Sequence, residues 1–158
     1  MKICLIVIGE TQKKWVHSGE MEYIKRISHY IQFQQITIPD TRKNKNFSVE
    51  RQKEVEGDLI MSRLSPGDMV VLLDERGKEL TSREMSVSLQ KYMNMGLKRL
   101  VFIIGGPYGF PNVFYDLFGA NMLSISKMTF PHDLIRVMFV EQLYRALTLL
   151  NNEPYHHD

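Results

Sequence analysis

The chain has almost no cysteine and no apolar run long enough to cross a membrane. Its single cysteine, Cys4, excludes an internal disulfide and is expected to be a small buried side chain rather than a nucleophile. The apolar residues 3–8 are too few to span a bilayer, and they lack the charged leader and cleavage site of a signal peptide. We therefore expect a protein of the reducing cytoplasm with no membrane partner.

A strong charge of one sign is also lacking. The 20 Lys and Arg residues nearly balance the 18 Asp and Glu residues, so composition alone does not indicate nucleic-acid binding. The densest basic cluster contains Arg42, Lys43 and Lys45, and it is either a solvated loop or a phosphate-contacting loop. With 158 residues, of which 44% are hydrophobic, the chain is long enough for one globular domain with a substantial core.

Short apolar runs alternate with segments of helical periodicity. Strands are predicted over residues 3–8, 35–38, 69–73, 100–104 and 123–127. Helices are predicted over residues 14–30, 49–64, 82–95, 112–118 and 134–150, with Ser48 and either Thr81 or Ser82 as N-caps. This alternation predicts an α/β fold with a mostly parallel sheet and helices on both faces. Ligands of such sheets bind beyond the carboxyl ends of the strands.

Common nucleotide-binding motifs are absent. A dinucleotide fingerprint starting at Gly105 would need glycine where Pro107 and Phe110 stand, and no Walker A sequence occurs. The Gly105-Gly106 pair is therefore either a tight turn or part of a small-molecule site that does not recognise phosphate. The charged segment from Asp74 to Gly77 is either a surface turn or a ligand loop. Asp74 would serve as a general base only if burial raised its pKa.

The closing helix is apolar on nearly every side. Val140, Leu143, Leu147 and Leu150 form one stripe, while other apolar residues occupy the remaining faces. Burying more than one face favours a homodimer. Two arginines interrupt these faces: Arg145 is spaced to pair with Glu141, and Arg136 either pairs with Asp133 or contacts a substrate.

Histidines lie on both sides of this helix. His132 follows Pro131 and is either a neutral helix-capping residue or a proton-transfer group, since histidine has an unperturbed pKa of about 6.5. Tyr155, His156 and His157 follow Pro154, and we expect this tail to fold over an active site. The histidines lack zinc-ligand spacing, so no metal is expected.

Several segments together closely resemble the ribosomal large-subunit methyltransferase H family of the SPOUT superfamily. The resemblance covers the whole chain, from residues 1–9 and Leu72-Leu73-Asp74 to Arg136 in the closing helix. Its other segments are IGGPYG at 104–109, LSISKMTFPH at 123–132, EQLYRA at 141–146 and PYHH at 154–157. The resemblance implies a single SPOUT methyltransferase domain of residues 1–158, an α/β fold with a C-terminal deep trefoil knot.

The same resemblance implies an activity. The enzyme would use S-adenosyl-L-methionine to methylate N3 of pseudouridine 1915 in helix 69 of bacterial 23S rRNA, acting as a homodimer on assembled ribosomes. Its cofactor-binding residues would be Leu73, Gly105, Leu123, Ser124, Ile125, Ser126, Lys127 and Met128. Its catalytic candidates are His156 and Arg136, ranked first, with Tyr155 and His132. The resemblance leaves open which of them is the base.

Two other classes of function compete with this one. A small α/β module could hold a nucleoside-like ligand without chemistry, or the protein could be a ribosome-assembly factor. A pure binding module has no need of Tyr155 and His156 at the terminus, so the chemistry of the tail separates the enzyme from both alternatives.

Overall fold

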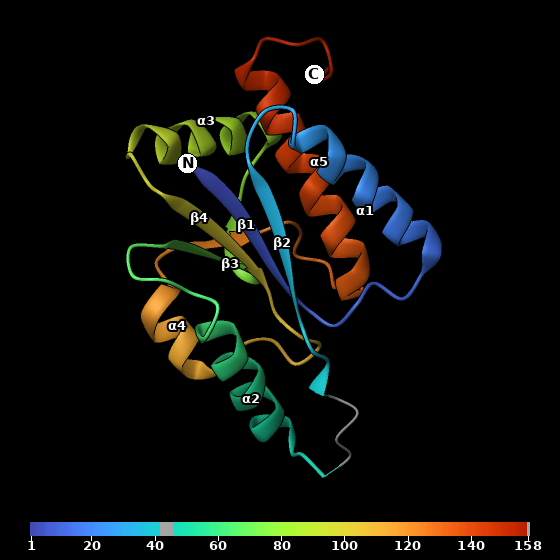
Figure 1. Cartoon of the computed structure of the whole chain (residues 1–158), viewed down its shortest axis with the longest axis vertical. Helices are drawn as coiled ribbons and strands as arrows, with labels where there is room; N and C mark the ends of the chain where they lie inside the picture. Colours follow the sequence, from blue (N-terminus) through green and yellow to red (C-terminus); the bar gives the residue numbers. More distant parts are fainter. Residues whose placement is uncertain (42–45, 158) are drawn as a thin grey trace.

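The computed structural model describes residues 1–41 and 46–157, and the predicted basic cluster at Arg42, Lys43 and Lys45 lies outside them. The described strands are β1 (Lys2–Ile8), β2 (Phe33–Ile38), β3 (Met69–Glu79), β4 (Arg99–Ile104) and β5 (Met122–Ser124). The helices are α1 (Lys14–Ile27), α2 (Val49–Met61), α3 (Ser82–Asn94), α4 (Asn112–Phe118) and α5 (His132–Leu150). The strands form one parallel sheet in the order β2-β1-β4-β3-β5 (Figure 1).

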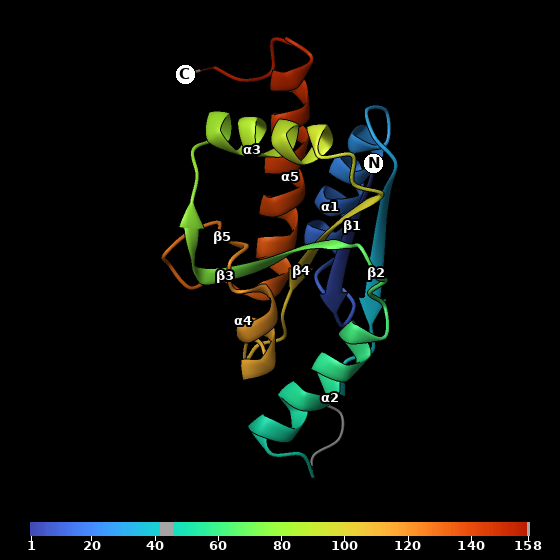
Figure 2. The same cartoon turned by 90° about the vertical axis from the view of Figure 1, so that its left-hand side faces the viewer.

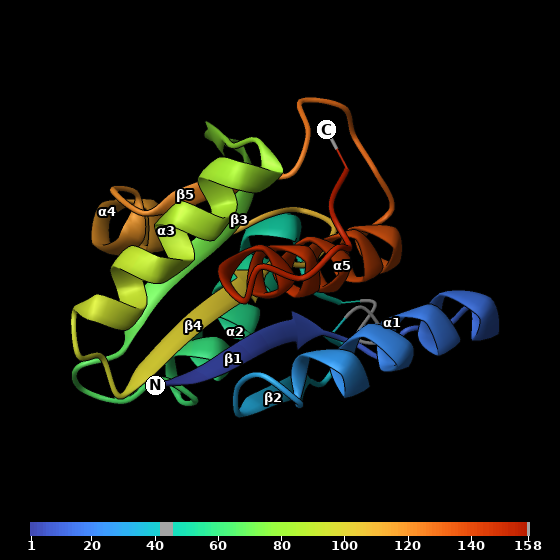
Figure 3. The ribbon, with the colours of Figure 1, turned by 90° about the horizontal axis from the view of Figure 1, so that it is seen from above.

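The sheet is covered on both faces, as the sequence predicted. Because side chains alternate along a strand, Ile3, Leu5 and Val7 of β1 face one cluster of buried residues, which includes side chains of α1, α3 and α5. Cys4 and Ile6 face a second cluster, which includes side chains of α2 and α4. Figure 3 shows α1, α5 and α3 side by side over the first face. The predicted α/β architecture is therefore confirmed.

Local sequence signals explain where the helices begin and end. The Ser48 hydroxyl accepts a hydrogen bond from the Arg51 amide at the start of α2. Thr81 and Glu84 form a full capping box at the start of α3, and Gly96, with φ of 69°, follows that helix. The helix predicted over residues 14–30 ends earlier, at Ile27.

Strand β3 runs further than predicted. The segment from Asp74 to Gly77, expected as a loop, continues β3 as far as Glu79, beside β5 (Figure 2). The register of the pairing between β3 and β5 shifts between Leu73 and Lys78. Gly77 makes this pairing possible, because a Cβ there would stand 2.7 Å from backbone atoms of Met122 and Leu123. Strand β5 is correspondingly shorter than predicted and ends at Ser124. The trefoil knot stays a prediction of the family resemblance.

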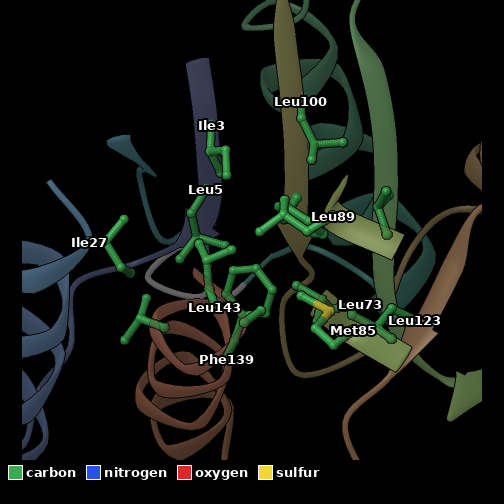
Figure 4. Close-up of a cluster of buried hydrophobic side chains, with 14 of the residues drawn as sticks. Ile3, Leu5, Ile27, Leu73, Met85, Leu89, Leu100, Leu123, Phe139 and Leu143 are labelled. Carbon is green, nitrogen blue, oxygen red and sulfur yellow. The ribbon is translucent and has the colours of Figure 1, made fainter. Parts of the chain in front are cut away.

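The central helix of the covering layer is α5, and every residue of it is buried or half-buried. Phe139 and Leu143 point from α5 toward Leu5 of the sheet (Figure 4), and the Phe139 ring lies 4.8 Å from that of Phe102, centroid to centroid. Leu147, with 2% of its surface exposed, belongs to the same cluster. The predicted stripe therefore fills the core of its own protomer.

Candidate active site

A cleft of about 640 Å³ opens at the carboxyl end of β4 and beside the part of β3 where its pairing with β4 ends. Its walls come from the extension of β3, the glycine loop after β4, the loop between β5 and α5, and the first turn of α5. This is the edge at which parallel sheets bind ligands. The cleft thus brings together three segments that are far apart in the sequence.

The glycine loop forms one wall with its backbone. A Cβ at Gly105 would lie 3.2 Å from Cε1 of Phe110, and one at Gly106 would lie 2.5 Å from Oε2 of the buried Glu56. The loop turns back on itself through a hydrogen bond from the Gly109 amide to the Gly106 carbonyl, 3.0 Å long. Because larger side chains would meet Phe110 or Glu56, glycine leaves backbone groups close to the cleft.

A compact polar cluster lies beside the glycine loop, because a Cβ at Gly109 would be 3.5 Å from the Tyr115 hydroxyl. The Asp74 carboxylate accepts hydrogen bonds from the Arg76 amide (2.9 Å) and Nε (3.1 Å), and from the Tyr115 hydroxyl (2.8 Å). The Arg76 guanidinium carbon lies 3.9 Å from the centroid of the Tyr115 ring. Tyr115 was not singled out from the sequence, because its position on α4 gives no spacing relation to Asp74.

The hydrogen bonds of this cluster determine whether the pKa of Asp74 is raised, as a general base would require. Partial burial of the carboxyl favours its neutral form, but the hydrogen bonds from Arg76 and Tyr115 outweigh that effect and lower the pKa of Asp74. Burial and the neighbouring Asp74 carboxylate raise the pKa of Tyr115. Asp74 is therefore a weak base at neutral pH. The condition under which it would act as a general base, a raised pKa, is not met.

Only some residues of the loop after β5 line the cleft. Ile125, Ser126 and Met128 line the cleft, as do Leu73 and Gly105. The other three predicted cofactor-binding residues, Leu123, Ser124 and Lys127, are not part of its lining.

Each of these three residues has a definite structural contact. Leu123 is buried in the core, and the Ser124 hydroxyl donates to the Ser126 carbonyl over 3.0 Å. Lys127 Nζ donates to the backbone carbonyls of Glu75 (2.6 Å) and Gly77 (3.0 Å), so it ties the loop to the extension of β3.

Two residues of α5, His132 and Arg136, approach the carboxylate of the buried Asp133. His132 lines the cleft, and its Nε2 is 3.2 Å from Oδ1 of Asp133. The other oxygen of Asp133 accepts a hydrogen bond from the Gln12 amide, 3.1 Å long. Arg136 is buried and donates to the Ile8 carbonyl and to Oγ1 of Thr11, and its Nη1 is 3.9 Å from Oδ1 of Asp133. Arg136 is not part of the cleft lining, and it fastens the β1–α1 loop to the start of α5.

The tail lies against the far part of α5. The ring of Tyr155 packs on Tyr144 at 4.8 Å between centroids, and its hydroxyl donates to Glu141 over 3.2 Å. Nδ1 of His156 is 3.4 Å from Nη1 of Arg145, which also forms the predicted ion pair with Glu141. Neither Tyr155 nor His156 lines the cleft of its own protomer. Burial, the Tyr23 hydroxyl and the Glu141 carboxylate together raise the pKa of Tyr155, so its phenol stays protonated at neutral pH.

Two further properties concern the described residues as a whole. Among residues 1–41 and 46–157, no group of three or more His, Cys, Asp and Glu side chains has a geometry that could hold a metal ion. Within the same ranges, no helix combines the length and the apolar character needed to cross a membrane.

Comparison with known proteins identifies the family. Residues 1–156 match the family model described as "Predicted SPOUT methyltransferase". The chain is 52% identical over 158 residues to a protein of Parabacteroides distasonis named ribosomal RNA large subunit methyltransferase H, and it covers 100% of both chains. Proteins of the same name from Porphyromonas gingivalis and Christiangramia forsetii are 51% and 50% identical, with 100% and 99% of each chain covered. The chain therefore belongs to the SPOUT methyltransferases, in the family of the proteins named ribosomal RNA large subunit methyltransferase H.

Proposed function

We propose that the protein is a cytoplasmic, S-adenosyl-L-methionine-dependent methyltransferase of large-subunit ribosomal RNA. Its target is N3 of pseudouridine 1915 in helix 69 of 23S rRNA on assembled 70S ribosomes. The chain acts as a single SPOUT domain with a C-terminal trefoil knot and forms a homodimer. The observation that carries the proposal is the cleft at the carboxyl end of β4 and beside β3, built from the segments of the family resemblance.

The cleft suits the methyl donor in size and chemistry. A volume of about 640 Å³ is in the range of small-molecule sites. Adenine is flat and uncharged, so the apolar side chains of Leu73, Ile104 and Ile125 and the backbone of the glycine loop can hold it without a phosphate cradle. When bound, S-adenosyl-L-methionine supplies an electrophilic methyl group on sulfur.

The remaining chemistry belongs to the chain. N3 of the pseudouridine carries a proton that must leave when the methyl arrives, so a base or a cation that stabilises the anionic ring assists the reaction. His132 is the strongest of the four candidates, since its imidazole lines the cleft and Asp133 is positioned to orient it. Arg136 lies outside the cleft lining, and its guanidinium is 3.9 Å from the same Asp133 oxygen. The protonated phenol of Tyr155 is better suited to hold the substrate than to remove its proton.

A second protomer explains how the tail takes part. Tyr155 and His156 contact Glu141, Tyr144 and Arg145 of α5, and none of these residues lines the cleft of the same protomer. A dimer brings the tail of one subunit to the cleft of the other without unfolding these contacts. The half-buried apolar residues of α5, such as Met138 and Leu149, supply surface for the interface.

The activity is tested by mass spectrometry of ribosomal RNA. Purified protein, incubated with S-adenosyl-L-methionine and 70S ribosomes from cells that lack it, is expected to add one methyl group to pseudouridine 1915. Free 23S rRNA is the matched substrate control and should be methylated much more slowly. If the incubated ribosomes stay unmethylated and the deletion strain accumulates ribosomal precursors, the result would instead support an assembly factor. If the incubated ribosomes stay unmethylated and no precursors accumulate, it would support a binding module.

The contribution of the tail across the dimer is tested by mixing two inactive variants. A chain truncated after Pro154 keeps its cleft, while a full-length Gly105→Val chain keeps its tail. Each homodimer should methylate at least about 100-fold more slowly than the wild type, the factor that corresponds to about 3 kcal/mol. Mixed dimers, formed by co-expression, should recover activity in the one cleft that has both parts. Full activity of the truncated chain alone would contradict any role for the tail.

A further inference from the structure

The start of α1 presents an unusual side chain to solvent. Trp15 is the only tryptophan of the chain, and 65% of its surface is exposed. The next residue, Val16, is 1% exposed, so the helix itself is packed against the protein. Tryptophan is normally among the most buried side chains on average, and a single exposed indole on an ordered helix suggests a contact with another molecule.

The surroundings of Trp15 are polar and locally cationic. Lys13, Lys14 and His17 are exposed, and the first turn of α1 contains no acidic residue. Glu10 is an exposed carboxylate in the preceding loop, and Glu22 further along α1 is paired with Arg26. Lys13 and Lys14 are the two residues that precede Trp15 in the sequence. A cationic surface with an exposed aromatic ring is the combination that binds single-stranded nucleic acid.

Direct contacts connect this surface to the cleft. The Gln12 amide, just before Lys13, donates to Asp133, and Asp133 in turn is 3.2 Å from Nε2 of His132 in the cleft. One turn after Trp15, Gly19 lies so close to α5 that a Cβ would be 3.1 Å from a methyl of Val137. Figures 1 and 3 show the first turns of α1 and α5 as neighbours. The backbone that carries Trp15 is thus connected to the cleft by packed and hydrogen-bonded residues.

We propose that residues 13–18 form an RNA contact surface, on which an unstacked base of the ribosomal RNA stacks against Trp15 while Lys13 and Lys14 contact neighbouring phosphates. This inference rests on the proposed function and assigns part of its substrate recognition. A second copy of the chain is the competing occupant. The adjoining lysines favour RNA, because lysine is depleted in the centre of protein interfaces and attracted to phosphate.

The first experiment uses Trp15 as its own probe. Because the chain has no other tryptophan, fluorescence excited selectively at tryptophan, and not at the seven tyrosines, reports on this surface alone. Single-stranded oligouridylate is expected to quench the emission of the full-length protein and to protect it from acrylamide, and salt should reverse both effects. Neither effect on addition of the RNA would overturn the proposal. Protection that grows with protein concentration in the absence of RNA would overturn it in favour of a second copy.

The second experiment measures methyl transfer to ribosomes. Trp15→Ala is expected to raise KM for ribosomes about 10-fold, the effect of losing one stacked base, with kcat and the affinity for S-adenosyl-L-methionine unchanged. Trp15→Phe should restore much of the loss. The matched control is Leu117→Ala on α4, a residue with 57% of its surface exposed, on the opposite face of the sheet. That variant should behave like the wild type.

The charges are tested in the same assay. The double variant Lys13→Gln, Lys14→Gln should weaken ribosome binding and reduce its salt dependence, while Lys91→Gln, Lys98→Gln removes the same charge elsewhere and should not. A wild-type enzyme that methylates ribosomes, combined with a Trp15→Ala variant of unchanged KM, would overturn the RNA contact and leave the proposed function standing. A wild type that methylates no ribosomal RNA, yet whose tryptophan responds to oligouridylate, would overturn the proposed function instead.

Discussion

Gly105→Val is expected to abolish binding of S-adenosyl-L-methionine. A Cβ at this position would already be 3.2 Å from the Phe110 ring, so the two methyl groups of valine must enter the cleft or displace that ring. Either movement removes space beside the apolar wall formed by Leu73 and Ile104. We expect at least about a 100-fold loss of affinity in isothermal titration calorimetry, equivalent to about 3 kcal/mol.

A graded series separates steric exclusion from general damage. Gly105→Ala adds only the Cβ, which Phe110 can accommodate by shifting a few tenths of an ångström, so its affinity should fall between those of the wild type and Gly105→Val. Thermal melting of each variant without ligand should show that the sheet remains folded. An unchanged affinity in Gly105→Val would place the cofactor outside this cleft.

Gly77→Ala is expected to destabilise the fold strongly. Its Cβ would stand 2.7 Å from backbone atoms of Met122 and Leu123, closer than any non-bonded contact allows. Backbone cannot rotate away as a side chain can, so β5 must separate from the extension of β3. We expect a loss of about 3 kcal/mol or more in the free energy of unfolding, measured by chemical denaturation.

The effect of Gly77→Ala should also reach the cleft. Lys127 donates to the Gly77 carbonyl, and Ser126 and Met128, beside it, line the cleft. Cofactor affinity should therefore fall together with stability.

Gly67→Ala is the matched control, because Gly67 has a φ of 87° but no atom within 4 Å of its Cβ position. It should cost only about 1 to 2 kcal/mol, the strain of the backbone conformation alone, and leave cofactor affinity intact. Equal losses in the two variants would argue against the close crossing.

The arrangement of strands and helices could be predicted because its signals are local. Apolar runs such as residues 100–104 are bounded by turn residues, and Ser48 and Thr81 mark helix starts by chemistry confined to one turn. The continuation of β3 past Asp74 could not be predicted. Its sequence is charged, as a surface turn would be, and it is extended only because β5, nearly fifty residues later, pairs with it.

The candidate site was predictable in its location but not in its contacts. Gly105 and His132 follow recognisable local patterns, and both line the cleft. The interactions of Lys127 with the β3 carbonyls and of Arg136 with the β1–α1 loop join distant segments. A single sequence contains no information on such pairs. Arg136 is an example, since its spacing to Asp133 can be seen in the sequence but its hydrogen bonds to Ile8 and Thr11 cannot.

The central place of α5 has a consequence for how the protein is made. Its residues 132–150 follow the other described helices in the sequence and leave the ribosome after them, yet they lie between α1 and α3 over the middle of the sheet. Until then, Leu5 and Phe102 lack the cover that Phe139 and Leu143 provide. The nascent chain therefore carries an open apolar sheet face until α5 has been made, and folding of this layer waits on contacts of high sequence separation. We expect nascent chains that lack α5 to depend on chaperones.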